Sequence, residues 1–270
     1  MTSAISGSGA QSARLDALNA ELDSVPASQR LSDDLFGVVD LFDGDPGLRR
    51  AISDPAVDAT ARIALAHRLL EDRIGPDALR LVDRALRIGW TSPVQLTRGL
   101  EQAGVRSELR TAQGAGAGVD VEDELFRFAQ TVRADPALSL ALSDADRPVK
   151  ARRELVSGLL EGRSRPETVV LAARAVRATK ASYTDVLDTY VGLSARMRDE
   201  QVAVVTTARG LTAEQRGEIL AQLERITGHR VDLKEAVDPT VLGGARISFG
   251  DEVIDGTVAR RLDQAQRTLG

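Results

Sequence analysis

Hydrophobic residues recur at the spacing of a single helical face through most of the first 200 positions. Ala61, Leu65 and Leu69 follow one another at intervals of four residues. This spacing places them on one side of an α-helix and predicts an amphipathic helix that packs in a bundle. Residues 12–25 and 95–113 show comparable spacing and predict two further helices.

The helical pattern occurs twice, at a distance of 90 residues. An ungapped alignment of residues 33–90 with residues 123–180 gives 21 identities in 58 positions. The absence of gaps favours the copying of one domain over a shared composition bias, and the period is too long for a solenoid repeat. We therefore predict two related helical bundles, at residues 11–93 and 94–200. The small polar residues 1–10 are expected to form a disordered tail.

The pattern changes after residue 200, where apolar residues alternate as they do in strands. Residues 201–208 and 230–234 are predicted strands, and Thr212 with Gln215 predicts a capping box that starts the helix between them. The helix is expected to bury a stripe formed by Ile219, Leu220, Leu223 and Ile226. The core of this part is expected to contain Val202, Val204, Ile219, Leu223, Val231, Ile247, Phe249 and Leu262. Residues 201–270 are predicted to form a strand–helix–strand–strand–helix unit. The fold class is thus mainly α, with two related bundles followed by a small α/β unit.

The stretch VLGGARISFGDEVIDG at residues 241–256 has three possible interpretations: a phosphate cradle, a metal loop or a β-hairpin. Its first glycines, Gly243 and Gly244, precede a predicted strand, so no helix N-terminus is available for an anion. Its acidic residues lack the spacing of a calcium loop. A hairpin, in which glycine permits tight backbone conformations, is the interpretation that remains.

Few residues are candidates for catalysis or metal binding. The chain has no cysteine, which excludes disulfides and thiolate sites. Of its two histidines, His67 is predicted to lie on a helix surface and His229 to follow a helix end, where a positive charge interacts favourably with the helix dipole. Asp144 and Asp146 resemble a metal pair, but the Ser-Asp dipeptide at this position is repeated in the first copy, which favours a helix cap. We expect no catalytic, cofactor-binding or metal-binding residue.

Composition and charge narrow the choice of partners. The formal net charge is −5, and 35 basic residues are scattered among 40 acidic ones, which argues against a nucleic-acid surface. No run of apolar residues is long enough to span a membrane, and the first residues do not form a signal peptide. The glycine run at 114–118 does not have the spacing of a phosphate-binding loop and is predicted to be a linker.

Residues 237–269 resemble the C-terminal signature of the delta subunit of bacterial F-type ATP synthase, a family whose mitochondrial relative is the oligomycin-sensitivity-conferring protein. The positions that match the family pattern are Asp238, Pro239, Leu242, Gly243, Gly244, Ile247, Gly250, Asp251, Val253, Ile254, Asp255 and Gly256. The resemblance covers about residues 94–270. The preceding residues look like a second copy of the family's helical domain, as in its long form.

This resemblance implies a non-catalytic stator connector, peripheral to the cell membrane on its cytoplasmic side. The helical domain would dock on the α subunits of the catalytic head, and the C-terminal unit would hold the b subunit of the peripheral stalk. No cofactor, nucleic acid or direct membrane insertion is implied. In the first copy, a groove between the first and fifth helices would draw on Leu15, Leu18, Leu22, Leu79, Val82 and Leu86. The alternative is a helical adaptor in signalling or secretion, which has no reason to carry the terminal hairpin.

Overall fold

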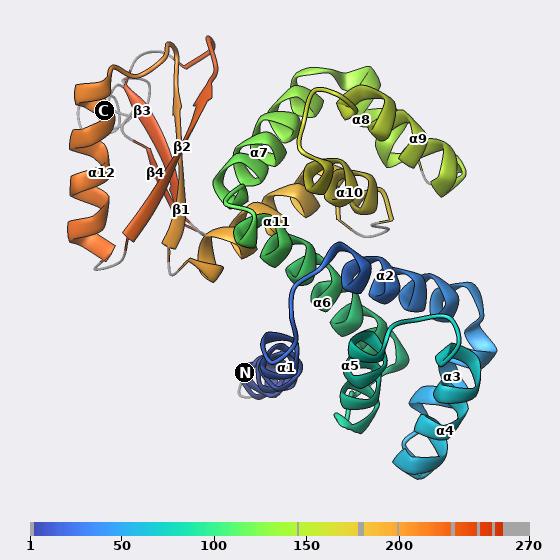
Figure 1. Ribbon diagram of the computed structural model, residues 1–270. Helices are drawn as coiled ribbons and strands as arrows, with labels where there is room; N and C mark the ends of the chain where they lie inside the picture. Colours follow the sequence, from blue (N-terminus) through green and yellow to red (C-terminus); the bar gives the residue numbers. More distant parts are fainter. Residues whose placement is uncertain are drawn as a thin grey trace. The chain divides into compact units, whose positions relative to one another are not determined.

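The computed structural model describes residues 3–144, 146–177, 181–198, 200–227, 230–241, 244–249 and 252–255. Twelve helices and four strands occur within these ranges (Figure 1). The chain divides into two compact units, unit 1 at Met1–Gly118 and unit 2 at Val119–Gly270.

Unit 1 is a bundle of six helices. They are α1 (Ser3–Asp23), α2 (Gln29–Gly44), α3 (Pro46–Ser53), α4 (Ala59–Leu70), α5 (Pro76–Arg87) and α6 (Pro93–Gly114). Its core is mostly aliphatic, as expected from the low aromatic content: Leu22, Leu81 and Leu100 are completely buried in it together with one aromatic residue, Phe42. The helix α6 packs against α1, α2, α3 and α5.

Unit 2 contains a second group of helices followed by a small α/β part. The helices are α7 (Gly118–Ala134), α8 (Pro136–Ser143), α9 (Val149–Leu160), α10 (Pro166–Ala175) and α11 (Tyr183–Met197). The α/β part consists of β1 (Glu200–Thr207), α12 (Ala213–Thr227), β2 (Arg230–Val237), β3 (Ala245–Phe249) and β4 (Glu252–Asp255). The predicted fold class, mainly α with a small α/β unit at the C-terminal side, is confirmed.

The duplication is visible in the helix bounds. The bounds of α3 and α4 become those of α8 and α9 when 90 is added, and α10 and α11 begin 90 residues after α5 and α6. The N-caps also correspond: the Asp45 carboxylate accepts from Gly47 N and Leu48 N, and Asp135 accepts from the equivalent amides. Such caps satisfy backbone donors that the first helical turn leaves free.

A second shared feature joins helices that are distant in the sequence. In unit 1 the carboxylate of Asp34, on α2, accepts a hydrogen bond from Gly75 N at 2.8 Å, just before α5. In unit 2 the equivalent Glu124, on α7, accepts from Arg165 N at 2.8 Å, just before α10. Both copies therefore position the start of their penultimate helix with an acid from the equivalent helix, α2 in unit 1 and α7 in unit 2.

The structure corrects two predicted boundaries. Residues 3–10 belong to α1, so the prediction of a disordered tail is wrong for them. Once residues further along have nucleated a helix, each added residue gains a backbone hydrogen bond, which allows the helix to extend. The predicted boundary at residue 93 is also wrong, because α6 belongs to unit 1. The glycine run at 114–118 joins the end of α6 to the start of α7, and Gly116 has a φ of 72° there.

The four strands form a mixed sheet in the order β2-β1-β3-β4. The strand β1 is parallel to β2 and antiparallel to β3, and β3 pairs with β4 as the predicted hairpin. One face of the sheet packs on α12 (Figure 1). Thr212 and Gln215 form the predicted capping box at the start of this helix. The last predicted helix, at 257–269, lies outside the described residues.

The predicted core of the α/β part is shifted by one residue in β1. Ala203 and Val205 are completely buried against α12, whereas Val202 and Val204 lie on the opposite face and are only partly buried. Both faces of β1 carry β-branched residues, so alternation alone does not show which face is the core. Ile226, also predicted to be buried, is 74% exposed.

Candidate docking surfaces

The predicted groove between α1 and α5 is closed in unit 1. Four of its six residues, Leu18, Leu22, Val82 and Leu86, are at most 1% exposed and belong to the bundle core. Leu15 and Leu79 are partly exposed. The sequence pattern identified the apolar face of each helix correctly, but the two faces pack against each other and do not line an open groove.

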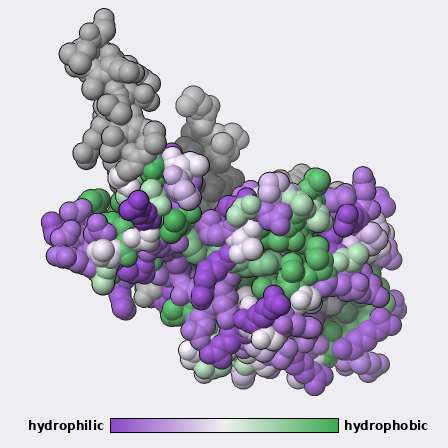
Figure 2. All heavy atoms as spheres, turned by 90° about the horizontal axis from the view of Figure 1, so that it is seen from above, coloured by the Kyte–Doolittle hydropathy of each residue, from purple (hydrophilic) through white to green (hydrophobic). Residues whose placement is uncertain are grey.

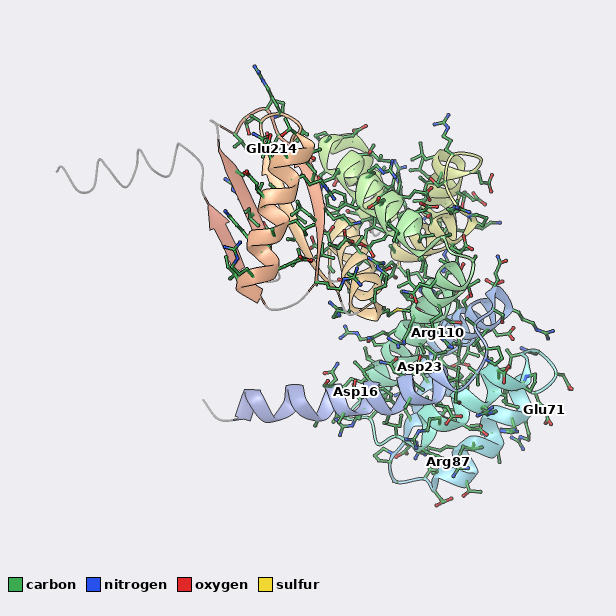
Figure 3. All side chains as sticks on the ribbon, turned by 60° about the vertical axis from the view of Figure 1, so that its left-hand side comes forward. Asp16, Asp23, Glu71, Arg87, Arg110 and Glu214 are labelled. Atoms are coloured by element: carbon green, nitrogen blue, oxygen red, sulfur yellow. The ribbon has the colours of Figure 1, made fainter. Side chains whose placement is uncertain are left out.

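Polar contacts surround the closed groove between α1 and α5. Arg80 of α5 donates to the carboxylate of Glu21 on α1 at 2.8 Å. The guanidinium of Arg14 donates to Gly89 O at 2.6 Å. Asp23, at the end of α1, pairs with Arg106 and lies beside Arg110 of α6 (Figure 3). These contacts hold α1 against α5, Gly89 and α6 of the bundle.

Unit 2 exposes more apolar surface on its short helices. Leu140 of α8 is 72% exposed, and Val149 and Leu155 of α9 are each more than a third exposed. At the positions equivalent to Leu140 and Leu155, the first copy has Arg50 and the core-packed Leu65. On the face seen in Figure 2, hydrophobic side chains are exposed among hydrophilic ones. An exposed apolar patch of this kind is typical of a protein-binding surface.

The signature residues after β2 form a turn. Asp238 accepts hydrogen bonds from Thr240 Oγ1 at 2.7 Å and Thr240 N at 2.9 Å, and these bonds lower the pKa of its carboxyl group. Its own N–H donates to Thr207 O at the end of β1. Gly244 has a φ of 79°, which favours glycine. The motif therefore shapes the connection from β2 to the hairpin.

Several signature positions have no structural description. Leu242, Gly243, Gly250, Asp251 and Gly256 lie outside the described residues. Pro239 is exposed, and Ile254 and Asp255 belong to β4, opposite Ile247 and Arg246 of β3. Their role in the signature stays a prediction beyond the strand pairing.

A cluster of charged residues that the sequence analysis missed joins the helices of unit 2 to the sheet. Lys234 of β2 is 4% exposed, and its Nζ lies 3.0 Å from Oε1 of Glu122, a completely buried residue of α7. The same ammonium lies 3.1 Å from Asp232 and contacts Asp123. Arg198, just after α11, donates to Glu122 Oε2 at 2.7 Å and to Asp232 at 3.2 Å. We call these five residues the charge cluster.

Burial and mutual contact shift the pKa values in the charge cluster. Burial raises the pKa of Glu122, and the neighbouring Asp232 adds to this effect. Burial alone would raise the pKa of Asp232, but Glu122 and the two cations lower it overall. For Lys234, the carboxylates outweigh burial and raise the pKa of the ammonium. The cations therefore stay charged in the interior because acidic groups surround them.

The residues considered for chemistry have structural roles. His67 Nε2 lies 2.9 Å from the carboxylate of Asp83 and so joins α4 to α5. Asp144 ends α8, and its carboxylate accepts from Asp146 N at 3.0 Å, as Asp54 does with Ala56 N. The predicted cap is thus a turn after the helix. His229 lies outside the described ranges. Within them, no group of three or more His, Asp or Glu is placed to hold a metal ion.

Membrane insertion was also considered from the sequence. Of the helices that the structure describes, none combines the length and the apolar character needed to cross a bilayer.

Duplicated helical bundles followed by a small α/β part define the architecture of the chain. Comparison with known families gives its identity. The family model for the ATP synthase delta (OSCP) subunit matches residues 107–269, and the chain belongs to this family. Members of this family are structural subunits of the peripheral stalk of the ATP synthase.

Similar proteins cover nearly the whole chain. A protein of Cutibacterium acnes named ATP synthase subunit delta is 47% identical over 239 residues, which are 88% of this chain and 91% of that protein. Proteins of the same name from Salinispora arenicola and Streptomyces avermitilis are 42% and 41% identical, and each match covers 95% of this chain and 93% of the relative. The adaptor in signalling or secretion has no support in these matches.

Proposed function

We propose that the chain is the stator connector of an F-type ATP synthase. It links the α subunits of the catalytic head to the membrane-anchored b subunit of the peripheral stalk, on the cytoplasmic side of the membrane. The connection stops the head from turning with the rotor, so that rotor torque drives ATP synthesis. Membership of the delta (OSCP) family is the observation that carries this proposal.

The separation of hydrophobic cores supports a division of labour between the parts. The core of unit 1 and the core between the sheet and α12 are separate clusters, and the latter includes no described residue of α7–α11. Parts with separate cores can present surfaces to different partners. We assign head binding to the helical bundles and stalk binding to the α/β part.

The exposed apolar residues suggest which surfaces bind. For the head, we propose the patch around Leu140, where an amphipathic helix of an α subunit can bury its apolar face. For the stalk, we propose the surface around Ile226 near the C-terminal end of α12, whose side chain is 74% exposed. The α1–α5 groove of unit 1 needs α1 to move before a peptide can enter, because four of its residues are core.

Two matched point variants test this assignment. Leu140→Asp should weaken binding to the head and leave stalk binding intact, whereas Ile226→Asp should do the reverse. Both side chains are exposed, so neither change should affect folding, which circular dichroism checks. Titration of each variant with isolated head and with the soluble domain of b measures the effects. Loss of the same partner in both variants would refute the assignment.

Titration of a 1–118 fragment with a peptide of the α-subunit N-terminus separately tests the groove. The fragment matches unit 1. If the groove opens, saturable binding follows, and substitution of the partly exposed Leu79 by Asp should abolish it. A folded fragment that shows no binding would exclude the groove in the first copy.

The connector itself is expected to perform no chemistry. We predict neither ATP hydrolysis nor nucleotide binding by the isolated protein, and saturable ATP binding in calorimetry would contradict this.

The function itself is tested in membranes depleted of this chain. Adding the purified protein should restore proton-driven ATP synthesis, while ATP hydrolysis by the head, which needs no stator, should be the same with and without it. Synthesis that proceeds at the full rate without the chain would overturn the proposal.

A further inference from the structure

The two helical copies differ at one buried pair of equivalent positions. In unit 1, Ser32 of α2 donates a hydrogen bond to the carboxylate of Glu108 on α6, and both residues are almost completely buried. Ninety residues later, the same two positions hold Glu122 of α7 and Arg198, which follows α11. These form an ion pair at 2.7 Å. The copies therefore keep a polar contact at this position but have changed its charge.

The changed pair lies where the second copy meets the sheet. Val231 and Leu233 of β2 pack against α12. Successive residues of a strand point to opposite faces, so Asp232 and Lys234 point away from α12. There the Lys234 ammonium contacts Glu122 and Asp123 of α7, and the Arg198 guanidinium reaches Asp232. None of the described residues of unit 1 belongs to a strand, and the Ser32–Glu108 pair joins two helices of the bundle.

The charges of the cluster are interdependent. Three carboxylates surround two cations, and Glu122 is 0% exposed while Lys234 is 4% exposed. Oε1 of Glu122 accepts no hydrogen bond from the described residues. The Lys234 ammonium, 3.0 Å away, therefore supplies the positive charge that balances this buried carboxylate. A buried charge that loses its partner is strongly unfavourable. Movement of the sheet away from α7 would separate these charges and is therefore opposed.

We propose that Glu122, Asp123, Arg198, Asp232 and Lys234 form a charge lock that holds the α/β part and the second helical copy as one rigid arm. The lock specialises the second copy, because the Ser32–Glu108 pair of the first copy contains no cation and bonds between two helices of its own bundle. The mechanical role of the arm rests on the proposed connector function. The lock itself is a property of the isolated chain.

Distance measurements on the full chain test the lock directly. The chain has no cysteine, so two introduced cysteines carry spin labels at unique sites. Glu161 at the end of α9 and Glu218 on α12 are exposed and suit the labels. We expect a narrow distance distribution in the labelled parent and at least a doubling of its width in Lys234→Met. In the matched control Arg133→Met, which breaks an exposed α7–α11 pair with Asp188 away from the sheet, the width should not change.

Two further variants keep the test decisive if Lys234→Met fails to fold. Asp123 is 44% exposed, so Asp123→Asn should fold and broaden the distribution less. Glu122→Gln combined with Lys234→Met removes opposite charges together and should narrow the distribution again relative to Lys234→Met alone. Unchanged widths in folded Lys234→Met, or in Asp123→Asn if Lys234→Met does not fold, would refute the lock.

The mechanical role is tested apart from the connector function. A variant that has a broadened distribution and binds both partners should support less proton-driven ATP synthesis than the parent. Full synthesis by that variant would refute the role of rigidity and leave the connector function intact.

Discussion

The two helical copies share their scaffold and differ where they meet something else. In both copies an aspartate, Asp45 or Asp135, caps the start of a short helix, α3 or α8. In both copies an acid from an earlier helix also positions the start of the penultimate helix, α5 or α10. They differ at the buried polar pair and at the exposed position held by Arg50 or Leu140. The comparison shows that duplication preserved the interactions that build the bundle, while the residues that face other parts or the solvent diverged.

The largest expected effect comes from removing Lys234 from the charge cluster of the second copy. Lys234→Met leaves Glu122, Asp123 and Asp232 with one cation, Arg198, and should destabilise the α/β part by ~3–5 kcal/mol. Hydrogen exchange of β1 and β2 amides, followed by mass spectrometry, measures this loss. Amides of unit 1 should exchange at the parent rate.

An exposed pair is the control for this prediction. Arg133 and Asp188 are each more than a third exposed, so Arg133→Met should cost no more than about 1 kcal/mol. Equal losses in the two variants would show that burial of the charge cluster is not what makes it important.

A smaller loss of stability is expected from a substitution at Gly99 of the first copy, which packs against the ring of Trp90. A Cβ at Gly99 of α6 would lie 2.5 Å from the ring of Trp90, whose Nε1 donates to Ala85 O. Gly99→Ala should therefore cost about 1–3 kcal/mol through overpacking. The equivalent residue of the second copy is the exposed Thr189, where alanine should be neutral or slightly stabilising. Thermal unfolding of both variants, with hydrogen exchange to locate the change, compares the copies directly.

The glycines of the α/β part should differ in a similar way. Gly244 has a φ of 79°, so Gly244→Val should destabilise the hairpin by about 1–2 kcal/mol. A Cβ at Gly217 of α12 meets nothing within 4 Å, so Gly217→Ala should stabilise the helix by about 0.5–1 kcal/mol. Opposite signs in urea unfolding are the expected result. A loss confined to the helical bundles in Gly244→Val would contradict the role of this turn.

The smallest effect concerns pH and the signature turn. Hydrogen bonds from Thr240 lower the pKa of Asp238 in the folded state. Its contribution to stability is therefore present above the pKa of the unfolded chain and is lost as the pH falls through the lower, folded value. Thr240→Ala should raise the pKa of Asp238 towards its ordinary value, as an NMR titration of the carboxyl group would show. An unchanged titration would mean that these hydrogen bonds do not set the pKa.

The sequence predicted the features that depend on local patterns. The period of 90 residues predicted two bundles, and the Thr212 capping box and the hairpin were identified from adjacent residues. The apolar faces of α1 and α5 were also correct. The sequence pattern could not show whether these two faces pack against each other or against a partner, because periodicity identifies an apolar face and not what covers it.

The features that were missed depend on distant residues. Glu122, Arg198 and Lys234 are far apart in the sequence, and each could be an ordinary surface charge until the fold brings them together. The core face of β1 was assigned wrongly because Val202, Val204 and Val205 make both faces similarly apolar. The spacing of apolar residues does not reveal that Leu140 is exposed, because its exposure depends on which neighbour the short helix α8 packs against.

The measurement that most directly tests the connector is a truncation after Arg198, assayed for binding to each partner. The separate core of the α/β part predicts that the fragment keeps the helicity of its bundles, with the Glu122–Arg198 pair now in contact with water. It should bind the catalytic head and fail to bind the b subunit. A fragment that unfolds, or that binds b as tightly as the full chain does, would contradict the division of labour between the helical copies and the sheet.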